Sequence, residues 1–375
     1  MFDTRKMTLR SSGPLPSQRT LFSALGLLCL SVGVGCASTS TANRRAPISA
    51  QDRQAAALAA DPAWRSALKE RATELLAQAS FGSDPMLRAN AIEGLQQAPD
   101  KIEAVARAGL TDENLGVRFA AAMTIGKLKL ADSTVFVDPL LKDPSKIVRA
   151  AAIYALRRNN VQADPTPLAS MLDSDKATER AQAAFILGEL GDGSAIALLR
   201  SSARRSSPLA SPIEDRLVRL QIAEALVKLG DLEAIETIRA SLFPSRPEDL
   251  ELTALAVQII GNVDDRRSLD QLIYLTGRTG QNRLPAEIRL AAAQSLAKLG
   301  NRRGAFIADE YRQDANPAIR AQSAFVLGAT DDPANLEKLD LLMSDPVGFV
   351  QVAAAAAALQ SSQRSDRTAN ADAQR

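Results

Sequence analysis

Two pairs of adjacent aspartates, Asp264-Asp265 and Asp331-Asp332, have a spacing that could support acid/base chemistry. In such a pair one carboxyl can hold a proton while the other stays ionised. Both pairs, however, lie between alanine- and leucine-rich stretches that are typical of helices. An aspartate at that place caps the start of the next helix. Helix capping therefore explains both pairs without catalysis.

Residue types that many enzyme mechanisms need are missing from the chain. It has 375 residues and no histidine, so it lacks the commonest metal ligand and the usual partner of a serine or cysteine nucleophile. Its two cysteines, Cys29 and Cys36, both lie near the N-terminus, which leaves the later part without a disulfide or a thiolate metal site. We also find no glycine-rich phosphate loop and no nucleophile elbow. We therefore expect no catalytic residue, no metal and no cofactor.

The charge balance argues against nucleic acid as a partner. The formal net charge is +2, and residues 1–19 contribute three positive charges to it, so the remainder is close to neutral. A general nucleic-acid binder carries a strongly basic surface. Aromatic residues make up only 4% of the chain, and no stretch after residue 50 alternates apolar and polar residues as a half-buried strand does. The composition favours an all-α protein that does not bind nucleic acid.

An arginine recurs at a fixed place in an internal repeat. It is usually preceded by Val, Ile or Leu, followed by small residues, and separated from the next copy by 30 or 31 residues, with three longer intervals. The nine positions are Arg88, Arg118, Arg149, Arg180, Arg219, Thr253, Arg289, Arg320 and Gln351. Asp-Pro or Asn-Pro precedes many copies, and Gly-Asp or a similar pair follows, which are start and stop signals of helices. Each unit is therefore predicted to be a first helix, a turn and a second helix that begins near the arginine.

This pattern resembles HEAT repeats, in particular the short units named after the HEAT-like repeats of phycobilisome lyases. The resemblance covers residues 84–360 and about nine units. It implies an all-α fold, an α-solenoid in which helix pairs stack as a right-handed superhelix with one continuous core. We expect residues 51–83, with Trp64, to form N-terminal capping helices. The polar residues 361–375 are predicted to be a disordered tail.

The repeated arginines have two interpretations. An arginine beside a turn aspartate of the preceding or same repeat would form an internal hydrogen-bonded pair, which is the interpretation we favour. Alternatively, a ladder of positive charge along the solenoid would bind an anionic partner. Thr253 and Gln351, which break the ladder, fit both interpretations.

The repeat period fails in two places, and these insertions are the candidate functional site. Extra residues follow Arg180 around positions 206–212 and follow Thr253 around positions 277–283, and the loop at 243–247 between them is slightly long. All three fall between the first and second helix of their units, so we expect them on one edge of the solenoid. Their basic residues are Arg204, Arg205, Arg246, Arg278 and Arg283. We predict that this edge binds an acidic protein or an anionic envelope polymer; tolerated surface insertions with solvated charges are the alternative.

The N-terminus reads as an export signal. A basic stretch precedes an apolar run from Leu21 to Gly35, which is too short to span a membrane comfortably. The motif Gly33-Val34-Gly35-Cys36 resembles a bacterial lipobox, although Gly33 stands where leucine is usual. We expect residues 1–35 to be a signal peptide, Cys36 to carry lipid, and residues 36–50 to be a flexible tether. Cleavage after Ala37, or an unmodified Cys36, remains an alternative.

These features predict an exported, lipid-anchored scaffold or adaptor of the cell envelope. Because Ala37 rather than aspartate follows Cys36, the resemblance to lipoproteins implies the outer membrane, facing the periplasm or the surface. An accessory protein that is lyase-like or chaperone-like and holds a client during modification is the second hypothesis, and self-association alone is the third. Deoxyhypusine hydroxylase is also HEAT-like, but its iron site needs histidine. Phycobilin lyases act inside the cell, which does not fit an export signal.

Overall fold

The repeat body consists of nine helix pairs. The computed structural model describes residues 55, 57–244 and 246–373, and these residues contain helices and no strand. The second helices of the pairs are α4 (Pro85–Gly94), α6 (Leu115–Leu128), α8 (Lys146–Arg158), α10 (Ala177–Leu190), α12 (Pro212–Lys228), α14 (Leu250–Asn262), α16 (Ala286–Lys298), α18 (Pro317–Ala329) and α20 (Gly348–Ala373). The first helices are α3 (Pro62–Ala79), α5 (Pro99–Gly109), α7 (Thr134–Val137), α9 (Thr166–Leu172), α11 (Ile196–Ala203), α13 (Ile235–Ala240), α15 (Leu269–Gly277), α17 (Ala305–Tyr311) and α19 (Asn335–Leu342). The predicted α-solenoid and its nine repeats are confirmed.

The helix boundaries follow the start and stop signals of the sequence. Asp84 caps α4, because its carboxylate accepts a hydrogen bond from the backbone N–H of Met86, and Pro85 occupies the first turn. Ser211 and Glu214 form a reciprocal capping box at the start of α12. Gly191 ends α10 in the left-handed conformation, with φ of 76°, which glycine adopts without strain. Local side-chain chemistry thus sets where each pair begins and ends.

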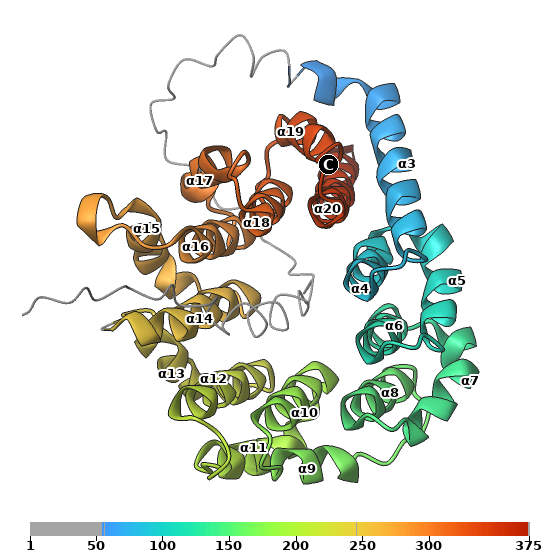
Figure 1. Cartoon of the computed structure of the whole chain (residues 1–375), viewed down its shortest axis with the longest axis vertical. Helices are drawn as coiled ribbons and strands as arrows, with labels where there is room; N and C mark the ends of the chain where they lie inside the picture. The colour runs from blue at the N-terminus through green and yellow to red at the C-terminus, as the bar shows by residue number, and fades with distance from the viewer. Residues whose placement is uncertain (1–54, 56, 245, 374–375) are drawn as a thin grey trace, which may run out of the picture. The chain divides into compact units, whose positions relative to one another are not determined.

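The helix pairs are arranged in two concentric rows (Figure 1). The second helices form the inner row and the first helices form the outer row. Each inner helix packs against the next one along the chain, and the last of them, α20, packs against α3 and α4. Apolar side chains of both rows are buried in a common core, including Ile92 and Ile125 of the inner row and Ile102 of the outer row. The solenoid of the described residues therefore closes into a ring.

Small residues let the inner helices approach each other closely. A Cβ on Gly188 would lie 2.9 Å from the Cα of Ala225 in the next inner helix, and one on Gly328 would lie 2.7 Å from the Cβ of Ala357. Gly94 has the same role where the ring closes, since its Cβ would lie 2.9 Å from the Cβ of Ala356. Real Cβ atoms do not come this close, so these contacts require glycine on one helix.

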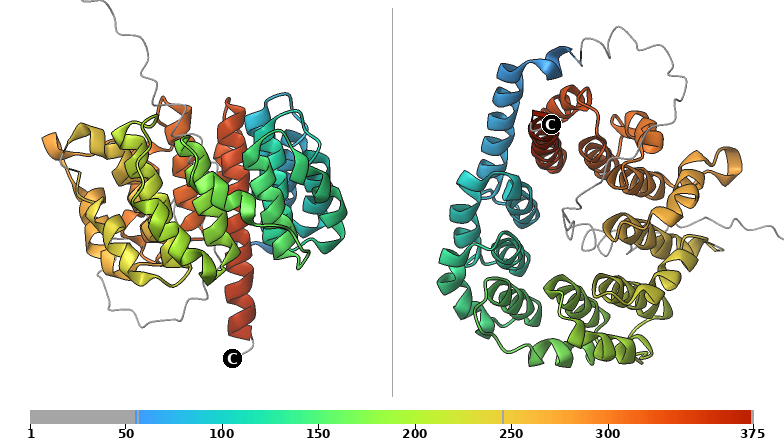
Figure 2. Two further views of the ribbon diagram at one scale, coloured as in Figure 1. Left: turned by 90° about the horizontal axis from the view of Figure 1, so that it is seen from below. Right: turned by 180° about the vertical axis from the view of Figure 1, so that it is seen from behind.

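Two predictions about the ends of the repeat region are wrong for the same reason. Helix α20 continues through Ala373 and extends beyond its neighbours (Figure 2), so residues 361–373 are not a disordered tail. Ser361 and Ser362 are buried, and the side-chain amide of Gln363 donates to the carbonyl of Gln97 at 2.8 Å. Helix α3 is the outer helix of the first pair and contacts α20, so it does not cap an open stack. Contacts across the closure of the ring stabilise these two segments, which their own sequences do not predict.

Four of the repeated arginines bind an aspartate of the next repeat, and Arg118 shows how. Its Nη1 donates to the carbonyls of Asp112 and Glu113, at 2.8 and 3.0 Å, in the turn that precedes α6. Its Nε and Nη2 donate to the two carboxylate oxygens of Asp143, at 2.8 and 3.1 Å. The corresponding pairs are Arg88 with Asp112, Arg180 with Asp215, and Arg320 with Asp345.

The predicted internal pairing is confirmed for these four arginines, but the position of the aspartate is different. We expected it in the preceding or the same repeat, whereas Asp143 belongs to the repeat that follows Arg118. The carbonyls of its own turn hold Nη1, and this turns the opposite edge of the guanidinium toward the next repeat. Each of the four pairs is therefore a cross-link between neighbouring repeats.

The predicted signal peptide, the lipidated Cys36 and the tether over residues 36–50 lie outside the described residues. None of the helices that the structure describes is long and apolar enough to cross a membrane.

Candidate protein-binding edge

Three consecutive loops join a first helix to a second helix on one edge of the ring. They connect α11 to α12, α13 to α14, and α15 to α16. The first loop lies on the turn between α9 and α10, since Arg205 pairs with Asp173 at 3.1 Å and the Ser207 hydroxyl donates to the carbonyl of Asp175 at 2.9 Å. The second is joined to the start of α12 through Arg216 and Asp249, at 2.7 Å. These contacts hold the first two loops against the repeat that precedes each of them.

The five predicted arginines of this edge differ in how far they are engaged within the chain. Arg205 pairs with Asp173, and Arg283 pairs with Glu310 and donates to the Tyr311 hydroxyl at 2.9 Å. Arg278 lies over the ring of Tyr274, with its guanidinium carbon 5.6 Å from the ring centre. These three side chains are thus held in place by their own fold.

Arg204 and Arg246 remain the most accessible cations. Both residues are exposed. Arg246 lies 3.7 Å from Asp249, whose carboxylate also accepts a bond from Arg216. Arg204 ends α11 and makes no ion pair within the described residues. The positive charge that this edge offers to a partner is therefore concentrated on the first two loops.

Apolar side chains stand beside these two arginines, and sequence reasoning missed them. Leu209 is 78% exposed and Phe243 is 61% exposed, each on one of the first two loops. The sequence did contain a signal for Leu209: it is an apolar residue within the Ser- and Pro-rich stretch 206–212. A loop of this kind has no core in which an apolar side chain could be buried. We define the basic-apolar edge as Arg204, Leu209, Phe243 and Arg246.

The local structure fixes the first loop. Ser207 is buried, and the Ser211–Glu214 capping box sets where the loop ends and α12 begins. Hydrogen bonds from the backbone and the hydroxyl of Ser211 hold the pKa of Glu214 below its usual value, so this carboxylate stays ionised at neutral pH. Leu209 is therefore presented on an anchored loop.

The described residues contain no group of three or more His, Cys, Asp or Glu side chains placed to hold a metal ion. The carboxylates Asp265 and Asp332 both cap turns, through bonds from the backbone N–H of Arg267 and of Ala334. Asp265 also pairs with Arg239, at 2.6 Å. Burial would raise the pKa of Asp265, but the bonds from Arg239 and Ser268 lower it overall. The capping role predicted for both pairs is confirmed at these two residues.

Comparison with protein families agrees with this architecture. Residues 72–157 match a model of HEAT repeats, and residues 179–204 and 218–243 match the PBS lyase HEAT-like repeat. Human deoxyhypusine hydroxylase in complex with glycerol is similar with 20% identity and a TM-score of 0.36, over 72% of this chain and 98% of that one. The complex of CpcE and CpcF of phycocyanin lyase from Nostoc has 18% identity and a TM-score of 0.35, over 68% and 94%.

A third similar structure is that of Kap121p bound to Nup53p, with 12% identity and a TM-score of 0.35, over 78% of this chain and 42% of that one. No curated protein is similar enough to count as a match. The chain therefore contains HEAT and PBS lyase HEAT-like repeats within its nine helix pairs.

Proposed function

We propose that this protein is an exported, lipid-anchored scaffold that binds another protein through the basic-apolar edge. The exposure of Leu209 and Phe243 on neighbouring anchored loops carries the proposal. Apolar side chains that protrude beside arginines are the composition of an interface centre, where aromatic, aliphatic and Arg side chains contribute most of the binding energy. The partner presents an apolar surface with acidic residues around it.

The anchor is the second element of the proposal. Lipid on Cys36 and a tether over residues 36–50 would keep the ring at an envelope membrane, which we take to be the outer membrane. Mass spectrometry of the mature N-terminus tests this directly. We expect an acylated Cys36 as the first residue; an N-terminus at Ser38 without lipid would contradict the anchor and leave the proposed binding edge standing.

The binding edge is tested by crosslinking in intact cells followed by affinity purification. Leu209→Ser combined with Phe243→Ser is expected to lower recovery of a stoichiometric protein partner at least tenfold. Leu232→Ser is the matched control, because Leu232 is 69% exposed at the start of η5 (Leu232–Ala234), between α12 and α13 on the opposite edge of the ring.

Recovery of the same partner by the double variant and by the unchanged protein would contradict the proposed edge. A partner that is an envelope polymer, or a client that leaves the complex chemically modified, would support one of the other hypotheses from the sequence and overturn the scaffold proposal. Self-association without another protein would also overturn it.

A further inference from the structure

Arg149 lacks the aspartate cross-link that Arg88, Arg118, Arg180 and Arg320 form with the following repeat. Its Nη1 donates to the carbonyls of Asp143 and Pro144, as the Nη1 of Arg118 does in its own turn, so the guanidinium is oriented in the same way. Asp143 lies six residues before Arg149. At the corresponding position of the next repeat, six residues before Arg180, the chain has Ser174. Within the described residues, no carboxylate accepts a hydrogen bond from Nε or Nη2 of Arg149.

The residues around this gap also differ from the other repeats. Ser174 donates its hydroxyl hydrogen to Glu179 at 2.7 Å, and Lys146 donates to the same carboxylate at 2.9 Å. Burial alone would raise the pKa of Glu179, but the bonds from Lys146 and Ser174 lower it, so the group is ionised. Valine occupies the position of Glu179 in the two preceding repeats. Glu179 is thus engaged by Lys146 and Ser174, and no bond from Arg149 reaches it.

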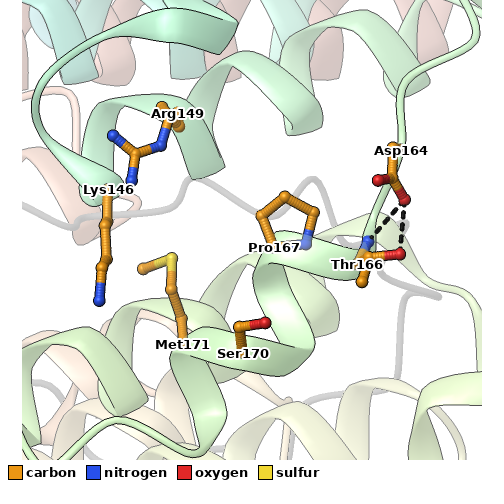
Figure 3. A pocket seen from close by; sticks show the side chains of 7 residues that line it. All are labelled: Lys146, Arg149, Asp164, Thr166, Pro167, Ser170 and Met171. Atoms are coloured by element: carbon orange, nitrogen blue, oxygen red, sulfur yellow. Dashed lines mark hydrogen bonds between the residues drawn. The ribbon is translucent and has the colours of Figure 1, made fainter.

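Arg149 and Lys146 line a pocket of about 320 Å³ between α8 and α9 (Figure 3). Thr166, Pro167, Ser170 and Met171 of α9 line the other side, together with Asp164 of the preceding loop. A pocket of this size accommodates a small organic group.

The charges of the pocket walls favour an anion at the α8 side. Asp164 lies across the pocket, and its Oδ1 already accepts bonds from the backbone N–H and the hydroxyl of Thr166, at 2.9 and 2.6 Å. These bonds hold the pKa of Asp164 below its usual value. An anionic ligand therefore meets Arg149 and Lys146 on one side and a carboxylate that is already hydrogen-bonded on the other.

The chain itself shows which anion this guanidinium geometry takes. In the four repeats with an aspartate pair, the same edge of the guanidinium holds a carboxylate, with distances of 2.8 and 3.1 Å at Arg118 and of 2.7 and 2.8 Å at Arg320. Two parallel N–H donors match a carboxylate better than a spherical anion. Pro167 and Met171 add an apolar wall for the methylene groups that carry it.

We propose that the pocket between α8 and α9 binds a carboxylate side chain of an acidic peptide segment, with Arg149 as the main donor and Lys146 as a second cation. In taking a protein as the ligand, this inference rests on the proposed function. The site adjoins the basic-apolar edge, because Asp173 and Asp175, on either side of Ser174, contact the loop that carries Leu209. One partner can therefore reach both.

Methionine-methyl NMR tests the proposal, since Met171 lines the pocket and the chain has only six methionines. The probe is the blocked tetrapeptide Ala-Glu-Ala-Ala, and its Gln analogue is the control. We expect the glutamate peptide to shift the Met171 methyl resonance in a saturable way and the glutamine peptide to leave it unchanged. Arg149→Ala should abolish the shift, whereas Arg303→Ala, at an exposed arginine of η9 (Arg302–Gly304) outside both the pocket and the basic-apolar edge, should preserve it.

A second variant keeps Arg149 and removes the site. Ser174→Asp combined with Glu179→Val installs the residue types of the preceding repeats, so the new aspartate occupies the guanidinium edge and the peptide should no longer shift Met171. Equal shifts with both peptides, a shift that survives in either variant, or a stronger response to inorganic phosphate would overturn the proposal. The NMR test needs no partner protein. If the peptide response is absent while the cellular complex is still recovered, the pocket proposal is contradicted and the scaffold proposal is not.

Discussion

Arg118 and Arg149 hold the same position in adjacent repeats, and the following repeat decides what each of them does. Both donate Nη1 to two carbonyls of their own turn. Arg118 then binds Asp143 through two bonds, whereas Arg149 faces a repeat with Ser174 at the corresponding place. The comparison teaches that the repeat orients the guanidinium, while one residue of the next turn determines whether it is a cross-link or is available to a ligand.

Removing the carboxylate of the paired repeat should have the largest effect. Asp143→Ala leaves the half-buried guanidinium of Arg118 without its acceptor, which we expect to lower the free energy of unfolding by about 3 kcal/mol. Ser174→Ala removes one hydrogen bond to Glu179 and should cost about 1 kcal/mol. Urea denaturation of the two variants measures both values, and equal losses would mean that the two turns do not differ in energy.

Acid should weaken the contribution of Arg118 to stability more than that of Arg149. Burial would raise the pKa of Asp143, but the bonds from Arg118 and the Ser145 backbone lower it overall. A lowered pKa in the folded state contributes stability that is complete above the pKa of the unfolded chain, about 4, and is lost as the pH falls through the folded value.

The difference in stability between the wild-type protein and Arg118→Ala should therefore shrink as the pH falls below about 4. The difference between the wild-type protein and Arg149→Ala should change less over the same range, because Arg149 lowers the pKa of Asp143 through its charge alone, without a hydrogen bond to that carboxylate. Denaturation at a series of pH values checks this. A pH-independent Arg118 difference would show that Asp143 does not hold the charge we assign to it.

Installing the missing aspartate should have the smallest effect on stability. Ser174→Asp combined with Glu179→Val is expected to raise the free energy of unfolding by about 1 kcal/mol, because it adds one cross-link of the kind found at Arg118. Ser174→Asn combined with Glu179→Val is the matched control, since it adds bulk without charge and should gain less. A loss of stability in the aspartate variant would show that the guanidinium of Arg149 cannot reach the next turn.

The repeat and its helices could be predicted from the sequence because their signals are local. Asp84-Pro85 and Gly191 mark helix ends by their own backbone preferences, and the recurring arginine marks each second helix. The closure of the ring could not be predicted, because it depends on contacts such as that of Gln363 with Gln97, which are far apart in the chain. By composition alone, the polar residues after Ser361 resemble a disordered segment. They differ from one only because the surface across the closure of the ring is present.

The candidate site was predicted in part. The insertions and their arginines were visible as breaks in the period, but the pairing of Arg205 and Arg283 with acidic residues depends on the folded edge. The exposure of Leu209 could not be predicted either, because a sequence pattern gives the residue type and not its accessibility. Ser174 could be recognised only after the structure had shown that the aspartate at this position is the partner of the preceding arginine.

The central claim, that the paired arginines hold the ring together while Arg149 does not, is tested most directly by comparing Arg118→Ala with Arg149→Ala in chemical denaturation. We predict a loss of about 3 kcal/mol for Arg118→Ala, which leaves Asp143 buried without its main partner. For Arg149→Ala we predict about 1 kcal/mol, from its bonds to the turn carbonyls alone. A loss at Arg149 as large as that at Arg118 would contradict the account.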